Sequence, residues 1–332
     1  MNMRFNVLAT LLLILSIPIL FFAQTSGAAT NGTFTVSISP QYPEPWSQAT
    51  LTILSSDIDM ANATVDVSAA GDEIYQGSVR PVEIQMGKAG SIANVKIVIT
   101  SNGANYSKII PIQAQDVAIV AEPVSSAPVL YPGKPLVPIE GKVRIVAIAN
   151  LQDTKGKVLD PNALSYSWTV DDVQIANSSG IGKQAIVVSS PLQYRARSVS
   201  VSVMSQDGSL FGGAEISISS QDPSVRIYKN DPLLGILFDN ALSGEYSIIG
   251  SEDTFYAAPF SLPTTDGAPT LQWLLNEEVA QAGNSITLKP SGSGEGSASL
   301  SVIASVGESV SRASENLSLL FGTESGFGLF GL

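Results

Sequence analysis

The sequence contains no cysteine and no histidine among its 332 residues. Without cysteine the chain has no disulfides, thiol nucleophiles or thiolate metal ligands, and no lipid-modified cysteine of the kind found in bacterial lipoproteins. Without histidine it lacks the commonest general base, the commonest metal ligand and the usual switch near neutral pH. Ser-His and Cys-His catalysis are therefore excluded, and a Ser-Lys pair has no local signature.

Basic residues are also scarce. The chain has 17 Lys and Arg against 29 Asp and Glu, which gives a net charge of −12 and a pI near 4.4. Nucleic-acid binding depends on neutralising phosphates with clustered basic side chains, and no segment carries such a cluster. The composition excludes nucleic acid as a partner and indicates a solvated, self-repelling acidic exterior.

There is one long apolar run, at the N-terminus. Arg4 supplies a short basic start, Val7 to Phe22 is almost wholly apolar, and small residues follow up to Ala29. Residues 1–29 are expected to be an export signal or a retained N-terminal membrane anchor, with residues 5–23 as the possible tether. In both cases the protein is exported, to the cell surface, the medium or the periplasm, and everything after Thr30 lies outside the cytoplasm.

The remainder alternates in the manner of β-strands. With 28 Gly and 19 Pro, the composition suits short strands joined by many turns. In Leu164–Asp172, four large residues alternate with small polar ones, which is typical of a half-buried strand with an aromatic anchor at Trp168. A similar strand is centred on Trp273, 105 residues later. The spacing predicts repeated modules of about 100 residues.

The predicted fold is all-β, a row of immunoglobulin-like sandwiches. Asn102-Gly103, between alternating strands, is a strong hairpin signal. Leu233–Leu242 is the best helical pattern, weakened by a glycine, and is expected to be a short helix or an irregular cap. The expected divisions are a signal or anchor at 1–29, sandwiches at 30–115, 139–222 and 223–322, a proline-rich linker or edge segment at 116–138, and an apolar glycine-rich tail at 323–332.

The run Tyr166-Ser167-Trp168-Thr169-Val170-Asp171 resembles the central strand of PKD-type and related immunoglobulin-like modules, with Asp172 where that family usually has Gly. Together with the Tyr-Pro pairs at 42–43 and 131–132, the chain resembles tandem Ig-like exported surface proteins of uncultivated bacteria. The resemblance implies sandwich modules and brings no established activity, because Ig-like folds host many functions. In such a sandwich Trp168 would fill the space between the sheets.

Several segments are candidate sites. Trp46 is the aromatic expected to be partly exposed, and so the better candidate for a ligand contact. Calcium is the most plausible ion, and 57–59, Asp171-Asp172 and Glu252-Asp253 could supply its oxygen ligands, although none extends into a spaced ligand series, which favours solvated loops. Residues 180–183 faintly resemble a phosphate loop and are expected to be a turn.

Two further segments bear on attachment. Residues 262–266 come within one residue of a sortase sorting signal but are internal, so wall anchoring by this route is rejected. Residues 323–332 are apolar and glycine-rich, and are either a frayed tail or a docking peptide for a partner's groove or sheet edge.

The sequence thus predicts a non-enzymatic structural or protein-interaction component of the cell envelope or surface, with no cofactor, and an envelope or surface protein as partner. The alternatives are an adhesin or carbohydrate-binding protein with a glycan partner, an accessory of a pilus or secretion apparatus and, most remotely, an envelope hydrolase with two carboxylates. The oligomeric state is left open.

Overall fold

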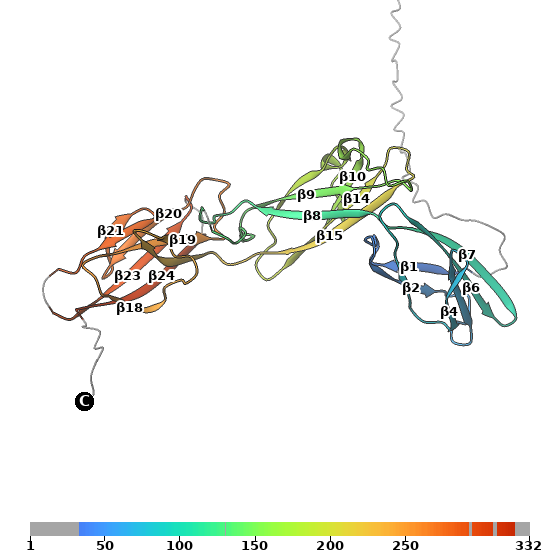
Figure 1. Cartoon of the computed structure of the whole chain (residues 1–332), viewed down its shortest axis with the longest axis horizontal. Helices are drawn as coiled ribbons and strands as arrows, with labels where there is room; N and C mark the ends of the chain where they lie inside the picture. The colour runs from blue at the N-terminus through green and yellow to red at the C-terminus, as the bar shows by residue number, and fades with distance from the viewer. Residues whose placement is uncertain (1–32, 130, 292–293, 308–310, 323–332) are drawn as a thin grey trace, which may run out of the picture.

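The computed structural model describes residues 33–129, 131–291, 294–307 and 311–322, which form three β-sandwiches in a row (Figure 1). The predicted all-β fold is confirmed. Helical structure within these ranges consists of the 3-10 turns Pro161–Ala163 and Ala176–Ser178, and no described helix has the length and apolarity to cross a membrane. The expected signal or anchor at 1–29 and the tail at 323–332 lie outside the described residues.

The first module pairs a three-stranded sheet with a four-stranded one. The smaller sheet has the order β1-β2-β5 and the larger one β4-β3-β6-β7. The strands are β1 (Thr35–Ser39), β2 (Gln48–Leu54), β3 (Thr64–Ala69), β4 (Asp72–Ser78), β5 (Val82–Gln85), β6 (Ile92–Ser101) and β7 (Ala104–Gln113).

The second module repeats this plan, with sheets β13-β9-β8 and β11-β10-β14-β15. Its strands are β8 (Asp116–Pro123), β9 (Lys142–Asn150), β10 (Ser165–Val170), β11 (Val173–Gln174), β12 (Gly180–Ile181), which pairs with β10, β13 (Ala185–Ser189), β14 (Ala196–Met204) and β15 (Phe211–Ser219).

The third module keeps the plan of the first and adds two strands, β17 and β18. Its sheets are β17-β16-β19-β22 and β18-β24-β23-β20-β21, and β18 runs parallel to β24. The strands are β16 (Ser224–Asp231), β17 (Gly235–Ile236), β18 (Gly244–Ile248), β19 (Asp253–Phe260), β20 (Thr270–Leu275), β21 (Glu278–Ala282), β22 (Ser285–Leu288), β23 (Gly296–Ser305) and β24 (Arg312–Phe321).

The strand order shows that the modules are structural repeats. In each, the first, second and fifth main strands form one sheet, and the third, fourth, sixth and seventh form the other, so the chain crosses between sheets as in immunoglobulin-like sandwiches. Each module also has its own buried apolar cluster between its two sheets.

The third strand of each module explains where the core sits. Side chains alternate across a strand, so one residue in two faces inward. Trp168 on β10 and Trp273 on β20 are fully buried, as predicted for Trp168, and Val67 is buried at the matching place on β3. Burying roughly 200 Å² of a tryptophan gives about 5 kcal/mol before the entropy of ordering is subtracted.

A second shared feature is the hairpin that follows this strand. Its two turn residues have positive φ in all three modules: Ala70-Gly71, Asp171-Asp172 and Asn276-Glu277. Two consecutive left-handed residues make the tight turn that matches strand twist. Asp172, with φ 64°, therefore takes a conformation for which glycine is the usual residue.

In two segments the structure selects between the alternatives that the sequence left open. Within 116–138, residues 116–123 are β8, which pairs with β9 along eight residues and is the edge strand of the second module. The later prolines lie beyond the strand, where no ladder hydrogen bond is lost. Residues 233–242 form no helix: they contain a turn and the two-residue strand β17, because Gly235 (φ 76°) bends the chain back onto β16.

Candidate functional site: the junction of the first two modules

The first and second modules are joined through two buried glutamines. Only residues 114 and 115 separate β7 from β8, and Gln113 and Gln115 are both almost inaccessible to solvent. The Gln113 amide donates to the Ser209 carbonyl (2.7 Å) and accepts from the Phe211 N–H (3.0 Å). Because both bonds cross from one module to the other, the side chain acts as an added main-chain partner for the β14–β15 turn.

Gln115 makes the same kind of contact with another segment of the second module. Its amide donates to the Gln152 carbonyl (3.0 Å) and accepts from the Gln152 N–H (2.9 Å). Beside it, Gly90 of the first module lies so close to the Gln152 and Asp153 carbonyls that a Cβ would come within 2.7 and 2.4 Å of them. These contacts fix the junction, since breaking them would leave buried amide groups unpaired.

Tyr42 is a third contact across this junction. It lies in the loop between β1 and β2, and its ring packs on Gly213 of β15, where a Cβ would come within 2.6 Å of the ring. Its hydroxyl is hydrogen-bonded to Ser202 of β14, and burial raises the pKa of the Tyr42 hydroxyl. Glycine inside a strand normally weakens it, so Gly213 is explained by this close approach.

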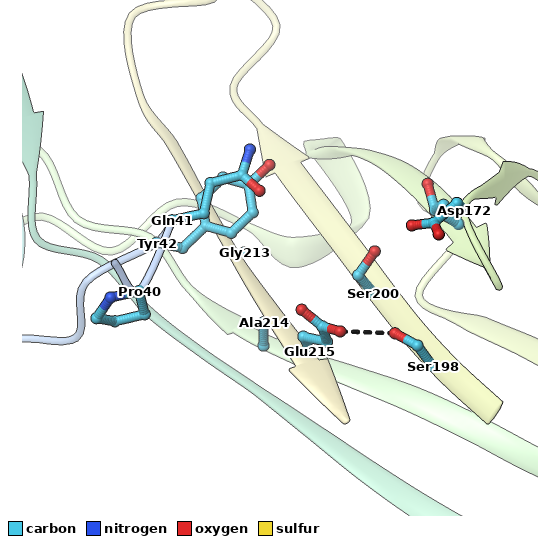
Figure 2. Close-up of a pocket in the computed structure, with 10 residues that line it drawn as sticks. Pro40, Gln41, Tyr42, Asp172, Ser198, Ser200, Gly213, Ala214 and Glu215 are labelled. Atoms are coloured by element: carbon cyan, nitrogen blue, oxygen red, sulfur yellow. Dashed lines mark hydrogen bonds between the residues drawn. The ribbon is translucent and has the colours of Figure 1, made fainter. Parts of the chain in front are cut away.

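A pocket of about 210 Å³ lies beside Tyr42, between the first loop and the outer face of the second module's larger sheet (Figure 2). Main-chain register places Thr169, Ser200 and Glu215 side by side on neighbouring strands. The pocket is lined by Pro40, Gln41, Tyr42, Thr169, Asp172, Ser198, Ser200, Gly213, Ala214 and Glu215. It is thus bounded by hydroxyls, an amide, two carboxylates and one aromatic ring.

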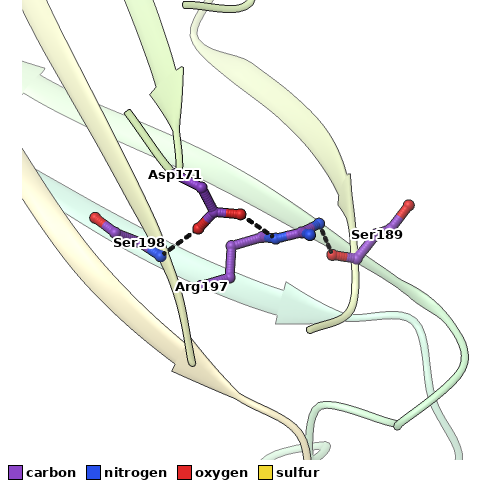
Figure 3. Close-up of polar contacts among 4 residues, drawn as sticks. All are labelled: Asp171, Ser189, Arg197 and Ser198. Atoms are coloured by element: carbon purple, nitrogen blue, oxygen red, sulfur yellow. Dashed lines mark hydrogen bonds and ion pairs between the residues drawn. The ribbon is translucent and has the colours of Figure 1, made fainter. Parts of the chain in front are cut away.

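The two aspartates of the β10–β11 turn have different surroundings. Asp171 pairs with the Arg197 guanidinium (2.9 Å) and accepts from the Ser198 N–H (3.0 Å) (Figure 3). Arg197 also donates to the Ser189 carbonyl (2.8 Å), which ties the turn to β13. Asp172 instead lines the pocket, as does Glu215, which accepts from the Ser198 hydroxyl (2.6 Å).

The carboxylates proposed for calcium are separated and engaged in local contacts. Asp57 accepts from Thr33 and Ser56, and Asp59 from the Ala61 N–H and Asn62. Glu252 pairs with Lys289, and Asp253 with Lys229. Across the described ranges, no group of three acidic side chains comes together in a way that could hold a metal ion.

The other candidate segments have structural contacts. Trp46 is 71% exposed, as expected, but does not line the pocket. The 180–183 segment turns back beside β10, and its Lys183 carbonyl accepts the Trp168 indole N–H (2.8 Å). Leu262 of the sortase-like segment is fully buried and exchanges hydrogen bonds with Ser126, which agrees with its rejection as an anchor.

The second and third modules are also joined by specific bonds. Ser126 donates from its N–H to the Leu262 carbonyl (2.7 Å), and its hydroxyl accepts from the Leu262 N–H (3.1 Å). The Ser261 hydroxyl contacts the Val137 and Gln221 carbonyls. The proline-rich segment therefore docks on the third module.

Tyr131, in that segment, is the aromatic contact of this second junction. Its ring packs edge-on against Phe260 and Phe238 of the third module, with centroids 5.0 and 5.7 Å apart. Both Tyr-Pro pairs of the sequence thus follow the first strand of one module and place the tyrosine on the next module. At the level of the sequence these pairs contribute only to the family resemblance; adjacent glycines within β15 were the available signal for the first contact.

No family model and no curated protein match the chain. Solved structures with similar strand arrangements include a fibronectin-III array of RIM-binding protein (9% identity, 86% of this chain and 95% of that one, TM-score 0.31). Another is a structure of three domains of the Hoc capsid protein of bacteriophage RB49 (12% identity, 86% of this chain and 99% of that one, TM-score 0.24). A third contains fibronectin-III-like modules of Clostridium thermocellum CbhA (15% identity, 56% of this chain and 94% of that one, TM-score 0.23).

Proposed function

We propose that the protein is an exported, non-enzymatic structural or protein-interaction component of a cell envelope or surface, in which three Ig-like modules form a stiff spacer. The observation that carries this proposal is the bonding at both junctions. Flexible tandem modules are joined by linkers with few crossing contacts. Here Gln113 and Gln115 bridge the first junction, and Ser126 and Ser261 bridge the second.

The spacing between modules tests this stiffness. Because the sequence has no cysteine, spin labels can be attached at Glu73→Cys in the first module and Val187→Cys in the second. We expect a narrow distance distribution by double electron-electron resonance, and a clearly broader one when Gln113 and Gln115 are both changed to Ala. Gln85→Ala is the matched control, because that amide bonds to main-chain carbonyls within the first module. A broad distribution in the parent protein would overturn the proposal.

Export requires its own experiment. Intact mass and cell fractionation of the natively expressed protein distinguish a chain cut near Ala29 and released from an uncut chain held in the membrane. Either result supports export, and the second makes the protein a tethered spacer. Recovery of the uncut chain in the soluble cytoplasm would contradict the proposal.

After an adhesin or carbohydrate-binding role, the remaining candidate is an accessory of a pilus or secretion apparatus, into which the segment 323–332 would dock. Pull-downs with and without these residues test it, with an unchanged partner list as the contrary result.

A further inference from the structure

The pocket beside Tyr42 has a chemical character that the spacer role does not require. Asp172 and Glu215 accept hydrogen bonds when ionised, whereas Gln41, Thr169 and Ser200 can donate as well as accept. Such a mixed lining recognises a ligand that carries both donors and acceptors around a small frame.

Other ligand classes fit this lining poorly. None of the ten lining residues, all within the described chain, is Lys or Arg, so an anion would face two carboxylates without compensation. An apolar ligand would dehydrate those carboxylates without replacing their hydrogen bonds. An ammonium or guanidinium group carries only donors and would leave the Gln41 N–H groups without a partner.

The size of the pocket and its aromatic wall restrict the class of ligand further. At about 210 Å³ the pocket is smaller than the roughly 300–1,000 Å³ typical of drug-sized ligands, which leaves room for a single small ring. Tyr42 is fixed by Gly213 beneath it and by its hydroxyl bond to Ser202, so its remaining surface forms a rigid wall (Figure 2). Rigid aromatic surfaces suit the C–H face of a saturated ring.

We propose that the junction pocket binds one neutral, polyhydroxylated ring of hexose size, either a free monosaccharide or the terminal sugar of a glycan. The ring lies against Tyr42, and its hydroxyls donate to Glu215 and Asp172 while Ser200 and Gln41 bond to its oxygens. Because the first module supplies Tyr42 and the second supplies both carboxylates, the site exists only in the joined form. Sugar binding at this site is a function beyond the spacer role, and it requires only the first junction to be formed.

The test is a titration of the purified full chain, labelled with ¹⁵N, with glucose, galactose, mannose and N-acetylglucosamine, free and as the end of a short oligosaccharide. We expect saturable amide shifts at residues 200 and 213–215 for at least one sugar. Tighter binding of the oligosaccharide identifies a glycan terminus, and equal binding identifies a free monosaccharide. The proposal is overturned if no sugar shifts these amides, or if methylguanidinium does so and the sugars do not.

Substitutions separate recognition from structure. Glu215→Gln is expected to weaken binding about tenfold, because a hydrogen bond to a charged acceptor is lost. Glu277→Gln is the matched control, since Glu277 occupies the position of Asp172 in the third module's hairpin, and it should bind as the parent does. Equal affinity of Glu215→Gln and the parent would contradict the site, whereas the electron-resonance distances report separately on the spacer.

Discussion

The indole N–H of Trp168 donates to the main-chain carbonyl of Lys183 across 2.8 Å, and the indole of Trp273 makes the equivalent bond to Gly283 at 2.9 Å in the next module. Each buried tryptophan therefore fills the core and also holds the segment that leads into the fifth main strand. This double role explains why residues 180–183, which superficially resemble a phosphate loop, have a structural task.

Trp168→Phe should destabilise the second module by about 2–3 kcal/mol. The substitution removes part of a fully buried side chain and leaves the Lys183 carbonyl without its donor. Hydrogen exchange of amides in each module measures the effect, because stability is local in a multi-module chain. Protection in the third module should stay unchanged, and an equal loss in both modules would show that they do not unfold separately.

The hairpin turns give a second prediction. Glu277 has φ 70° at a place where the first module has Gly71, so Glu277→Gly should stabilise the third module by about 1 kcal/mol through relief of left-handed strain. The reverse change, Gly71→Ala, should destabilise the first module although nothing lies within 4 Å of the added Cβ. Calorimetry should show transitions moving in opposite directions by several degrees, and a fall for Glu277→Gly would contradict the strain argument.

How far the sequence predicts this structure depends on the kind of signal. Trp168 lies in a strand with period-two alternation, so its burial follows from local pattern and volume. The repeat follows because Trp273 has the same surroundings one module later. Edge strands are harder: β8 ends at Pro123 beside several other prolines, and composition there is compatible with either a linker or an edge strand. Pairing with β9, which composition cannot show, decides for the edge strand.

Apart from the adjacent glycines within β15, local pattern gives no signal for the junction site. Tyr42 and Gly213 are far apart in sequence, and their contact depends on how two modules are docked. Gln113 carries no sequence signal either, because the sequence does not distinguish an exposed glutamine from one that bonds to a neighbouring module. Of the two pocket carboxylates, the sequence singles out Asp172 as a candidate ion ligand, whereas Glu215 carries no signal, because cross-strand register is what places Glu215 beside Ser200.

Alkaline pH should weaken the third module through Lys229. The Tyr246 hydroxyl and then the Asp253 carboxylate, 3.1 Å away, raise the pKa of Lys229 above its usual value of 10.5. A raised pKa in the folded state means that the stabilisation is complete below the unfolded value and is lost as pH rises through the folded one. Denaturation of the third module should therefore become easier above about pH 10.5, and Lys229→Met should flatten this dependence. An unchanged slope in the variant would refute the assignment.

The last prediction concerns force. In the third module, β18, which follows β16 and β17, pairs in parallel with the last strand β24 over five residue pairs, so a pull along the chain loads all these bonds together. In the first two modules the first strand pairs with the second and has no such ladder to the seventh. Pulling single molecules by their ends should therefore unfold the third module last.

Trp168→Phe supplies the marker for that experiment. The variant should lower the unfolding force of one event, that of the second module, and leave the final event unchanged. If the final event weakened instead, the second module would be the one that resists longest, and the parallel ladder of β18 and β24 would not be the mechanical restraint. A spacer that carries load at a surface needs such a restraint, which links this test to the stiffness argued from the junctions.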